Sequence, residues 1–304
     1  MTTLVADLPR EGNDACTIII ATLALAERKQ TLERAIRSLR MGNQALIEAV
    51  IVVNGNRFDP EVVAELRSRD DLRVVQIEQG SLSAAILAGR RSVTTPFFGF
   101  LDDDDEYLPA AVDMRIAALQ RHPEASIVAT NGFRYIDGED ALAMQRLHAV
   151  EKDPLDALFN ENWLASCGGL YRTRDLPPEL FDDVARYLEW TWLAFRFASL
   201  QKRVVVLDQP TFRIHDSAES ESKSDAYRMS RVAILERLLA ETRNEGIRKR
   251  IKSRIAQTWH DISCEHMRRG HFQDAWRAHV RSLGSLAGLK FLPYTRHLLF
   301  RSGG

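Results

Sequence analysis

Short apolar runs alternate with amphipathic segments through the first 130 residues, and this alternation constrains the fold more than any other feature of the sequence. The run 16–22, CTIIIAT, is β-branched and apolar at nearly every position, as in a strand covered on both faces. Segment 28–41 follows with Leu32, Ile36 and Leu39 at helical spacing. This rhythm is typical of βαβ units, so we expect an α/β fold with a mostly parallel sheet. The predicted strands are 16–22, 46–53, 72–77, 97–101 and 125–130, and the predicted helices are 28–41, 60–69, 81–92 and 109–121.

The pattern becomes less regular after residue 135. A helix is predicted over 186–200, and short strands over 204–207 and 211–215. The polar stretch 216–224, DSAESESKS, then resembles a linker, and the remaining residues have a helical pattern. We therefore predict two domains, residues 1–220 as the α/β domain and residues 225–304 as a helical extension.

Charge is distributed unevenly along the 304 residues. The whole chain has a net charge of −1, which gives no reason to expect a nucleic-acid partner. From Asp225 onward, however, there are 16 Lys and Arg against 7 Asp and Glu, so this region is net +9 and the first 224 residues are net −10. The sequence thus combines an acidic body with a basic C-terminal region.

Cysteines and targeting signals indicate a cytoplasmic protein. Cys16, Cys167 and Cys264 are far apart and form no CxxC pair, which argues against a disulfide framework and against structural zinc. The first residues, MTTLVADLPREGND, have no apolar core of a signal peptide. No run of about 18 apolar residues is present, so no transmembrane span is predicted.

Five consecutive acidic residues follow the predicted strand 97–101. In an extended backbone the side chains of Asp102 and Asp104 would point to one side and that of Asp103 to the other. Two carboxylates about 5 Å apart repel each other by roughly 3 kcal/mol at an effective dielectric constant of about 20. A divalent cation between them removes that repulsion, and Mg²⁺ and Mn²⁺ prefer oxygen ligands. The run therefore predicts a site for a metal and a diphosphate beyond a strand end.

Three other interpretations of the acidic run exist. Runs of charge are usually solvated loops, although here the run directly follows a buried strand and is closed by Pro109, which favours a first helical turn. A DDxxD site of the prenyl-synthase type belongs on a long helix, which the preceding strand opposes. The spacing of a calcium-binding loop, with its central glycine and distal glutamate, is absent.

Four segments in this order resemble the blocks of a family 2 glycosyltransferase with the GT-A fold. They are CTIIIATLALAERKQTLERAIRSL, AVIVVNGN, GSLSAAILAG and FFGFLDDDDEYLP, and the resemblance covers roughly residues 15–215. It implies an inverting enzyme that uses a nucleotide-sugar donor with Mn²⁺ or Mg²⁺. By the same resemblance Asp104 ligates the metal, Asp102 lies near the ribose or the metal, and Asp103 belongs to the nucleotide site.

The resemblance also assigns the nucleoside pocket, with two departures. Thr22 and Leu23 after the first strand, and Asn54 after the second, are expected to contact the nucleoside. The family usually has acidic residues where this chain has Val53 and Asn54, and this departure leaves the base open: a UDP-sugar is expected, with dTDP, GDP and CDP as alternatives. The family's Arg-Asn pair is replaced by Ile86 and Leu87 in GSLSAAILAG. Arg90 or Arg91, one turn further on, is expected to supply the missing charge.

Candidate residues for the reaction lie in the later part of the resemblance. Glu189 matches the first acid of the family's acidic pair and is the predicted catalytic base, although an acid in a first helical turn is also favoured by the helix dipole. Trp190 stands at the second acid and is expected, with Gly168, to contact the acceptor. Asp182 and Asp183 are the alternative bases. His215, in TFRIHDS, is the expected second metal ligand, and Arg213 in the same element is expected to neutralise phosphate.

The basic C-terminal region leaves several functions open. Its last part, GLKFLPYTRHLLFRSGG, interleaves cations with apolar side chains, which is typical of a peripheral membrane segment but equally of a helical extension that packs or dimerises. The acceptor is expected to be a saccharide or a lipid-linked saccharide, as in bacterial polysaccharide synthesis. The alternatives are a nucleotidyltransferase, which would usually show a glycine-rich loop after the first strand, and a non-catalytic nucleotide-sugar-binding subunit.

Overall fold

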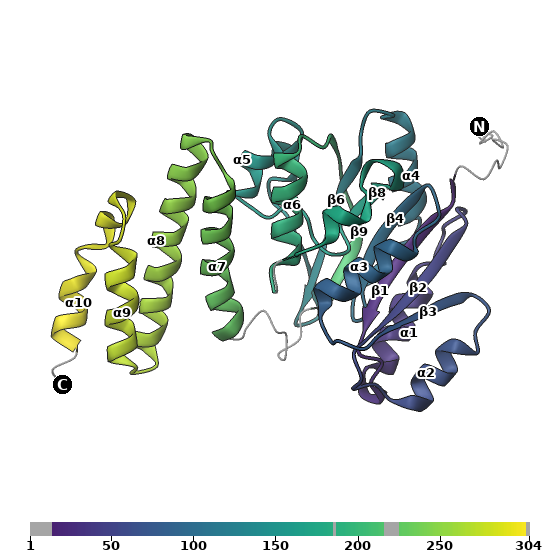
Figure 1. Cartoon of the computed structure of the whole chain (residues 1–304), viewed down its shortest axis with the longest axis horizontal. Helices are drawn as coiled ribbons and strands as arrows, with labels where there is room; N and C mark the ends of the chain where they lie inside the picture. The colour runs from purple at the N-terminus through teal and green to yellow at the C-terminus, as the bar shows by residue number, and fades with distance from the viewer. Residues whose placement is uncertain (1–13, 185–186, 216–224, 302–304) are drawn as a thin grey trace. The chain divides into compact units, whose positions relative to one another are not determined.

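The structure is a computed structural model that describes residues 14–184, 187–215 and 225–301 (Figure 1). Two compact units are distinguished by their internal contacts. The first contains residues 1–184 and 193–217, and the second contains residues 185–192 and 218–304. The polar linker predicted over 216–224 lies outside the described residues.

A single sheet organises the first unit. Its strand order is β3-β2-β1-β4-β8-β6-β9-β5, with β7 paired to β6 beside this path. Strands β1, β2, β3 and β4 are mutually parallel, whereas β8 runs antiparallel to both β4 and β6. The strands are β1 (Cys16–Thr22), β2 (Ile47–Asn54), β3 (Leu72–Ile77), β4 (Phe97–Asp102), β5 (Glu106–Tyr107), β6 (Ile127–Ile136), β7 (Glu139–Leu142), β8 (Gly169–Arg172) and β9 (Val204–His215).

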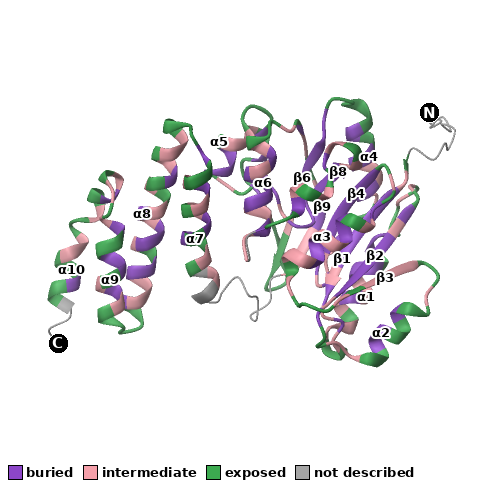
Figure 2. Cartoon of the chain, viewed as in Figure 1, coloured by how far each residue is buried: buried purple, intermediate pink, exposed green. Residues whose placement is uncertain are grey.

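The central strands form the core because helices cover them. Figure 2 shows β1, β2 and β4 buried along most of their length, with the exposed positions on the outer sides of the helices. Helix α3 packs on β1, β2 and β3, and α4 packs on β6, β8 and β9. The main helices are α1 (Lys29–Ser38), α2 (Pro60–Arg67), α3 (Leu82–Ser92), α4 (Ala111–Arg121), α5 (Pro154–Leu158) and α6 (Glu189–Ser199), and a 3-10 turn, η2 (Ala26–Arg28), precedes α1.

Local sequence signals fix several helix starts. Asp59 accepts hydrogen bonds from the Glu61 and Val62 N–H groups, and Pro60 occupies the first position of α2. Ser81 caps α3 through the N–H of Ala84. Helix α4 begins at Ala111, so Pro109 lies before the helix rather than in its first turn.

The second unit is helical from residue 225 onward, as predicted. Short turns connect α7 (Asp225–Glu241), α8 (Glu245–Arg268) and α9 (Phe272–Ser282), and a 3-10 segment, η7 (Leu286–Phe291), leads to α10 (Tyr294–Arg301). One core cluster joins α7, α8 and α9 through Val232, Trp259, Ile262 and Ala278. Another joins α8, α9 and α10 through Met267, Ala275 and Leu298. No helix among the described residues is long and apolar enough to cross a membrane.

Two predicted strands proved to be one. The segments predicted over 204–207 and 211–215 form the continuous strand β9, which pairs with β6 across register shifts near Asn131. The irregularity coincides with Pro210, which has no N–H to donate. The three cysteines are free, as the sequence predicted.

Candidate functional site

Polar side chains collect where three parallel strands end. Strand β1 lies between β2 and β4, with Thr22 opposite Val53 and Ala21 opposite Asp102. Asn54 is the last residue of β2 and Asp102 the last of β4, so these side chains share one edge of the sheet. In open α/β sheets, ligands bind beyond the carboxyl ends of strands, where the strand order reverses. The first candidate site is therefore this edge.

The acidic run forms a turn at that edge. Strand β4 ends at Asp102, the Asp105 N–H donates to the Asp102 carbonyl oxygen (3.2 Å), and the chain returns as β5. The prediction of an extended backbone here was wrong, because pairing of β5 with β9 requires the chain to reverse. Burial nevertheless alternates: Asp102 and Asp104 are partly exposed, whereas Asp103 and Asp105 are buried.

The two partly exposed aspartates are the ones that a ligand can reach. The side chain of Asp104 is 40% exposed, against 8% for Asp103. Asp102 is oriented by Ser166, whose hydroxyl donates to Asp102 Oδ2 (2.6 Å). Asp104 Oδ2 lies 3.0 Å from the Arg28 guanidinium.

Asp103 faces the protein rather than an open site. It accepts a hydrogen bond from the Thr22 hydroxyl (2.6 Å) and a second, charge-assisted bond from Arg28. The bond to Asp103 raises the pKa of Arg28, against the effect of its partial burial. Asp103 is thus engaged by two protein partners, the hydroxyl of Thr22 is engaged in the same bond, and the nucleotide contact of Asp103 stays a prediction.

Sequence reasoning missed the basic residues that neutralise this turn. Arg28, at the end of η2, bonds to Asp103 and Asp104, and Arg34 of α1 bonds to the Asp104 carbonyl oxygen. The available signal was the basic stretch ERKQTLER directly after the first strand. These arginines lie some 70 residues before the aspartates, and only the parallel pairing of β1 with β4 brings them together.

Asp105 shows how crowded the carboxylates are. Burial raises the pKa of Asp105 well above its ordinary value, and the charges of Asp102 and Asp104 raise it further. The His215 backbone N–H donates to Asp105 Oδ1 (3.0 Å) and favours the charged form. Added negative charge at this turn is therefore opposed, and added positive charge is favoured.

His215 and Arg213 approach the acidic turn from β9, where both contact Glu106. His215 Nε2 lies 3.1 Å from Glu106 Oε1, and Arg213 lies 2.8 Å from the same oxygen. Burial opposes ionisation of Glu106, but the bonds from Arg213 and His215 outweigh it and lower the pKa of Glu106. The ring of His215 is thus tied to Glu106 rather than placed on Asp104.

The turn has the chemistry of a hard-cation site. Asp102 and Asp104 offer carboxylate oxygens, which Mg²⁺ and Mn²⁺ prefer, and both are accessible. Their effect on the pKa of Asp105 shows that they are close enough to repel a third carboxylate. The residues present therefore fit a divalent cation, with Arg28 providing part of the neutralising charge in the protein alone.

Other predicted site residues have roles in packing. The Arg90 side chain is buried, donates to the carbonyl oxygens of Leu176 and Thr173, and lies over the Phe98 ring. This placement does not support contact of Arg90 with a nucleotide. Gly168 is also buried, and a side chain there would meet Phe212 at 3.1 Å, so its small size serves close packing.

Asn54 and Leu23 remain at the strand-end edge. The Asn54 Oδ1 accepts a hydrogen bond from the Ser81 N–H (2.7 Å), which ties the end of β2 to the start of α3. With that oxygen engaged, the amide NH₂ is the group that Asn54 can offer to a ligand. Leu23, next to Thr22, is partly exposed.

The predicted catalytic base, Glu189, belongs to the second unit. Glu189 begins α6, is buried, and accepts a hydrogen bond from the Tyr187 N–H (3.0 Å). Residues 185–192, including Trp190, group with the second unit, whereas Asp182 and Asp183 belong to the first and are exposed. The structure therefore does not test whether Glu189 meets the acidic turn.

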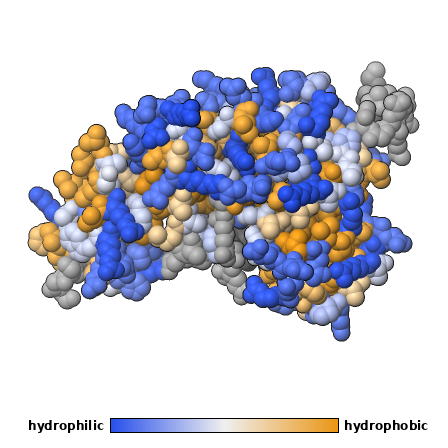
Figure 3. All heavy atoms as spheres, in the orientation of Figure 1, coloured by the Kyte–Doolittle hydropathy of each residue, from blue (hydrophilic) through white to orange (hydrophobic). Residues whose placement is uncertain are grey.

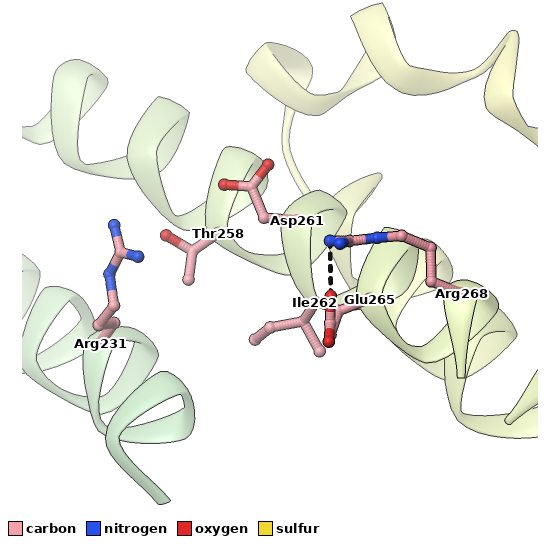
Figure 4. A pocket seen from close by; sticks show the side chains of 6 residues that line it. All are labelled: Arg231, Thr258, Asp261, Ile262, Glu265 and Arg268. Atoms are coloured by element: carbon pink, nitrogen blue, oxygen red, sulfur yellow. Dashed lines mark ion pairs between the residues drawn. The ribbon is translucent and has the colours of Figure 1, made fainter. Parts of the chain in front are cut away.

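A small cavity also occurs within the second unit (Figure 4). Its volume is about 150 Å³, and Arg231 of α7 and four residues of α8 contribute polar side chains to it, among them Glu265 paired with Arg268 (2.5 Å). Sites for drug-sized ligands usually measure about 300–1,000 Å³. This cavity is too small for a nucleotide sugar.

Comparisons with known proteins agree with the architecture. The family described as Glycosyl transferase family 2 matches residues 17–185. No curated protein sequence matches the chain. The structure of S. aureus TarS 1-349 in complex with UDP-GlcNAc is similar, with 15% identity, a TM-score of 0.60, and coverage of 93% of this chain and 88% of that one.

Two further structures of the same protein are similar. S. aureus TarS 1-349 in complex with UDP has 16% identity and a TM-score of 0.56, and covers 93% of this chain and 87% of that one. S. aureus TarS 1-349 alone has 15% identity and a TM-score of 0.54, with coverage of 88% and 80%. At these identities the likeness concerns the fold, and it confirms the predicted GT-A arrangement with a C-terminal helical region.

Proposed function

The chain belongs to glycosyl transferase family 2, and from this membership we propose that it transfers a sugar from a nucleoside diphosphate to an acceptor hydroxyl. The observation that carries the proposal is the edge where β1, β2 and β4 end with Asp102 and Asp104 accessible. The donor is a UDP-sugar, which agrees with the UDP-GlcNAc and UDP in the TarS structures.

We assign donor binding to the strand ends. Leu23 and the backbone after Thr22 contact the nucleoside, and the Asn54 amide donates to a base carbonyl. Asp102, oriented by Ser166, binds the ribose. Asp104 holds Mn²⁺ or Mg²⁺, which when bound stabilises charge on the leaving diphosphate. His215 and Arg213 close the diphosphate side, where the Arg213 guanidinium pairs with Glu106 and His215 bonds to the same carboxylate.

The transfer proceeds as a single displacement with inversion. Glu189 accepts the proton of the acceptor hydroxyl as its oxygen attacks the anomeric carbon, and the donor diphosphate leaves from the opposite face. Trp190 provides an aromatic face for a sugar ring of the acceptor, and the transferred sugar is a hexose for polysaccharide synthesis.

The acceptor is lipid-linked in this proposal. Five apolar side chains, which we term the apolar strip, are exposed in η7, at the residue that follows it, and in α10. Figure 3 shows hydrophobic residues at the surface over these segments, at the left of the view. The strip consists of Leu286 (89% exposed), Leu289 (52%), Leu292 (55%), Leu299 (57%) and Phe300 (83%).

Charge around the apolar strip matches an anionic surface. The sequence has five Lys and Arg and no Asp or Glu after Asp274. Apolar side chains among cations are the pattern of helices that lie on anionic lipid. We therefore place the protein in the cytoplasm, bound peripherally at the inner face of the membrane through this strip.

The decisive experiment measures transfer and donor binding separately. UDP-, dTDP-, GDP- and CDP-sugars are tested for turnover with Mn²⁺, comparing wild type with Glu189→Gln and with Glu179→Gln, an exposed glutamate, as matched control. We expect Glu189→Gln to abolish turnover, to preserve UDP binding, and to differ from the control. Donor binding without turnover by the wild type would instead support a non-catalytic subunit, and full turnover by Glu189→Gln would refute the assigned base.

Membrane contact is tested with vesicles. Wild type should sediment with anionic vesicles and not with neutral ones, and the Leu286→Ser/Phe300→Ser double variant should lose this binding. Met41→Ser, at an exposed apolar residue of the first unit, is the control. Equal binding by wild type and the double variant would contradict the assigned surface.

A further inference from the structure

The turn between α8 and α9 brings three potential metal ligands together. His266 lies in the last turn of α8, His271 is the N-cap of α9, and Asp274 lies in the first turn of α9. Gly270 adopts a left-handed conformation (φ 76°), and the His271 N–H donates to the His266 carbonyl oxygen (2.9 Å). The hydrogen-bonded turn thus fixes the two imidazoles near each other, with ring centroids 6.0 Å apart.

The distances suit a metal ion. One ligand atom from each of the three residues lies within 4.8 Å of the other two, and no other such group of three His, Cys, Asp or Glu occurs among residues 14–184, 187–215 and 225–301. Around a tetrahedral zinc ion with bonds of about 2.0–2.1 Å, ligand atoms are roughly 3.3 Å apart. His271 and Asp274 are exposed, so small rotations of their side chains can bring the ligand atoms from the observed separations of up to 4.8 Å to those required around zinc.

Coordination would break few existing interactions. His266 Nδ1 is buried and has no hydrogen-bond partner among the described residues. Asp274 uses Oδ1 to pair with Arg277 (2.9 Å) in an exposed contact, and its other oxygen can bind a metal while that pair persists. The ligands can therefore reorganise at low cost.

We propose that His266, His271 and Asp274 form a zinc site that clasps α8 to α9. Two imidazoles and a carboxylate are a zinc donor set, whereas Mg²⁺ and Ca²⁺ prefer oxygen ligands throughout. Three protein ligands leave the fourth position to water. The site is thus distinct in chemistry from the acidic turn of the first unit.

A zinc ion at the α8–α9 turn would also affect the packing of α10. Met267 and Ala275, which follow His266 and Asp274 in the sequence, pack with Leu298 of α10 in one core cluster. Fixing the α8–α9 turn therefore stabilises the helix that carries Leu299 and Phe300 of the apolar strip. Zinc would order this surface without taking part in chemistry at the strand ends.

The test uses the chain of 304 residues with Asp104→Asn, which removes the proposed metal ligand of the acidic turn. After removal of metals with a chelator, zinc is titrated in competition with a chromophoric chelator, and the melting temperature is followed in parallel. We expect one zinc per chain and a zinc-dependent rise in melting temperature, because a ligand of the folded state stabilises it. X-ray absorption should show nitrogen and oxygen ligands at about 2.0–2.1 Å with imidazole scattering.

His271→Ala and Asp274→Asn are the informative variants, since both residues are exposed and their replacement should not disturb folding. Each should weaken zinc binding by more than the roughly 10- to 100-fold that loss of an outer-shell partner costs. His297→Ala, another exposed histidine of the second unit, should bind as the parent does. Absence of a zinc site in the parent, or unchanged affinity in both variants, would overturn the proposal.

Discussion

The first unit and the helices 225–301 of the second differ in where they keep charge; the buried Glu189 belongs to the second unit but lies outside those helices. The first buries Arg90, Asp103, Asp105 and Arg115, each less than 9% exposed. Between residues 225 and 301, every Asp, Glu, Lys and Arg whose side chain is described is at least partly exposed, and the buried titratable group is His279.

Buried and exposed charges suit different functions. Taking a charge out of water costs several kcal/mol unless partners compensate it, so buried charge marks a place where the protein arranges charge for a ligand or for strict packing. Exposed cations beside apolar side chains cost little and suit reversible contact with a surface. Donor and metal binding are therefore expected in the first unit, and attachment in the helices after residue 225, while the proposed base Glu189 comes from residues 185–192 of the second unit.

The largest expected effect tests the reaction at the acidic turn. Asp104→Asn removes the accessible charge proposed to hold the metal, and turnover should fall by about 10³-fold, the scale on which a charge that stabilises a transition state acts. The measurement is kcat/KM with a UDP-sugar and Mn²⁺. Asp70→Asn, at an exposed aspartate of the same unit, is the matched control and should keep its activity. Equal loss in both variants, or none in Asp104→Asn, would break the contrast between the units.

The second-largest expected effect is a loss of folding stability when the buried Arg115 is replaced. Arg115 is fully buried, donates to the Thr211 hydroxyl and the Cys167 carbonyl oxygen, and lies over the Tyr107 ring. Arg115→Ala should lower the free energy of unfolding by about 3–5 kcal/mol, because it leaves a cavity and strands polar partners.

Arg281 provides the counterpart in the second unit. It is exposed and lies over the Trp259 ring (4.6 Å), so Arg281→Ala should cost about 1 kcal/mol or less. Denaturant unfolding of both variants measures the difference. Similar losses would show that burial of charge does not distinguish the units.

A smaller effect concerns competition at the acidic turn. Arg28 pairs with Asp103 and Asp104, so Arg28→Gln should tighten Mn²⁺ binding by the protein alone, by roughly 3- to 10-fold for a partly screened pair. Electron paramagnetic resonance of free Mn²⁺ during titration gives the dissociation constant without an activity assay. Arg37→Gln, an exposed position of α1, is the control. Weaker Mn²⁺ binding by Arg28→Gln would mean that the arginine shapes the turn more than it competes for it.

The contrast also explains what the sequence could predict. Strands β1 and β3 were predicted at their observed bounds because both are rich in β-branched residues, Ile18–Ile20 in β1 and Val74 and Val75 in β3. Strand β7 was missed because all four of its residues are exposed, and β8 because it is only four residues long and begins at a glycine. An exposed or very short strand leaves little periodic signal, since pairing rather than burial creates it.

Within the site, chain order was predictable and long-range pairing was not. The aspartates and the approach of His215 followed from motifs, whereas the role of Arg28 depends on a contact across 75 residues. The packing role of Arg90 likewise depends on Thr173 and Leu176, more than 80 residues away. Polar side chains near a motif in sequence can serve either a ligand or the core, and only tertiary contacts decide which.

The smallest expected effect is a loss of stability of the second unit at acid pH. Burial lowers the pKa of His279 from its ordinary value of 6.5, and the charge of His260 lowers it further. Its Nε2 lies 2.9 Å from the Thr295 hydroxyl, and its Nδ1 has no hydrogen-bond partner among the described residues. Protonation is therefore easier in the unfolded chain, so the stability that neutral His279 contributes is present above pH 6.5 and is lost as pH falls through its folded-state pKa.

Hydrogen exchange at two pH values measures this change in stability for the second unit separately. Peptides from α8 and α9 should exchange faster at pH 5.5 than at pH 7.5 after correction for intrinsic rates, with a chelator present so that zinc does not contribute. His279→Gln should reduce this pH dependence, because Gln does not titrate, whereas His122→Gln at an exposed position of the first unit should not. If His279→Gln retains the full acid sensitivity, the buried histidine is not its source, and the exposed charges of the unit must be.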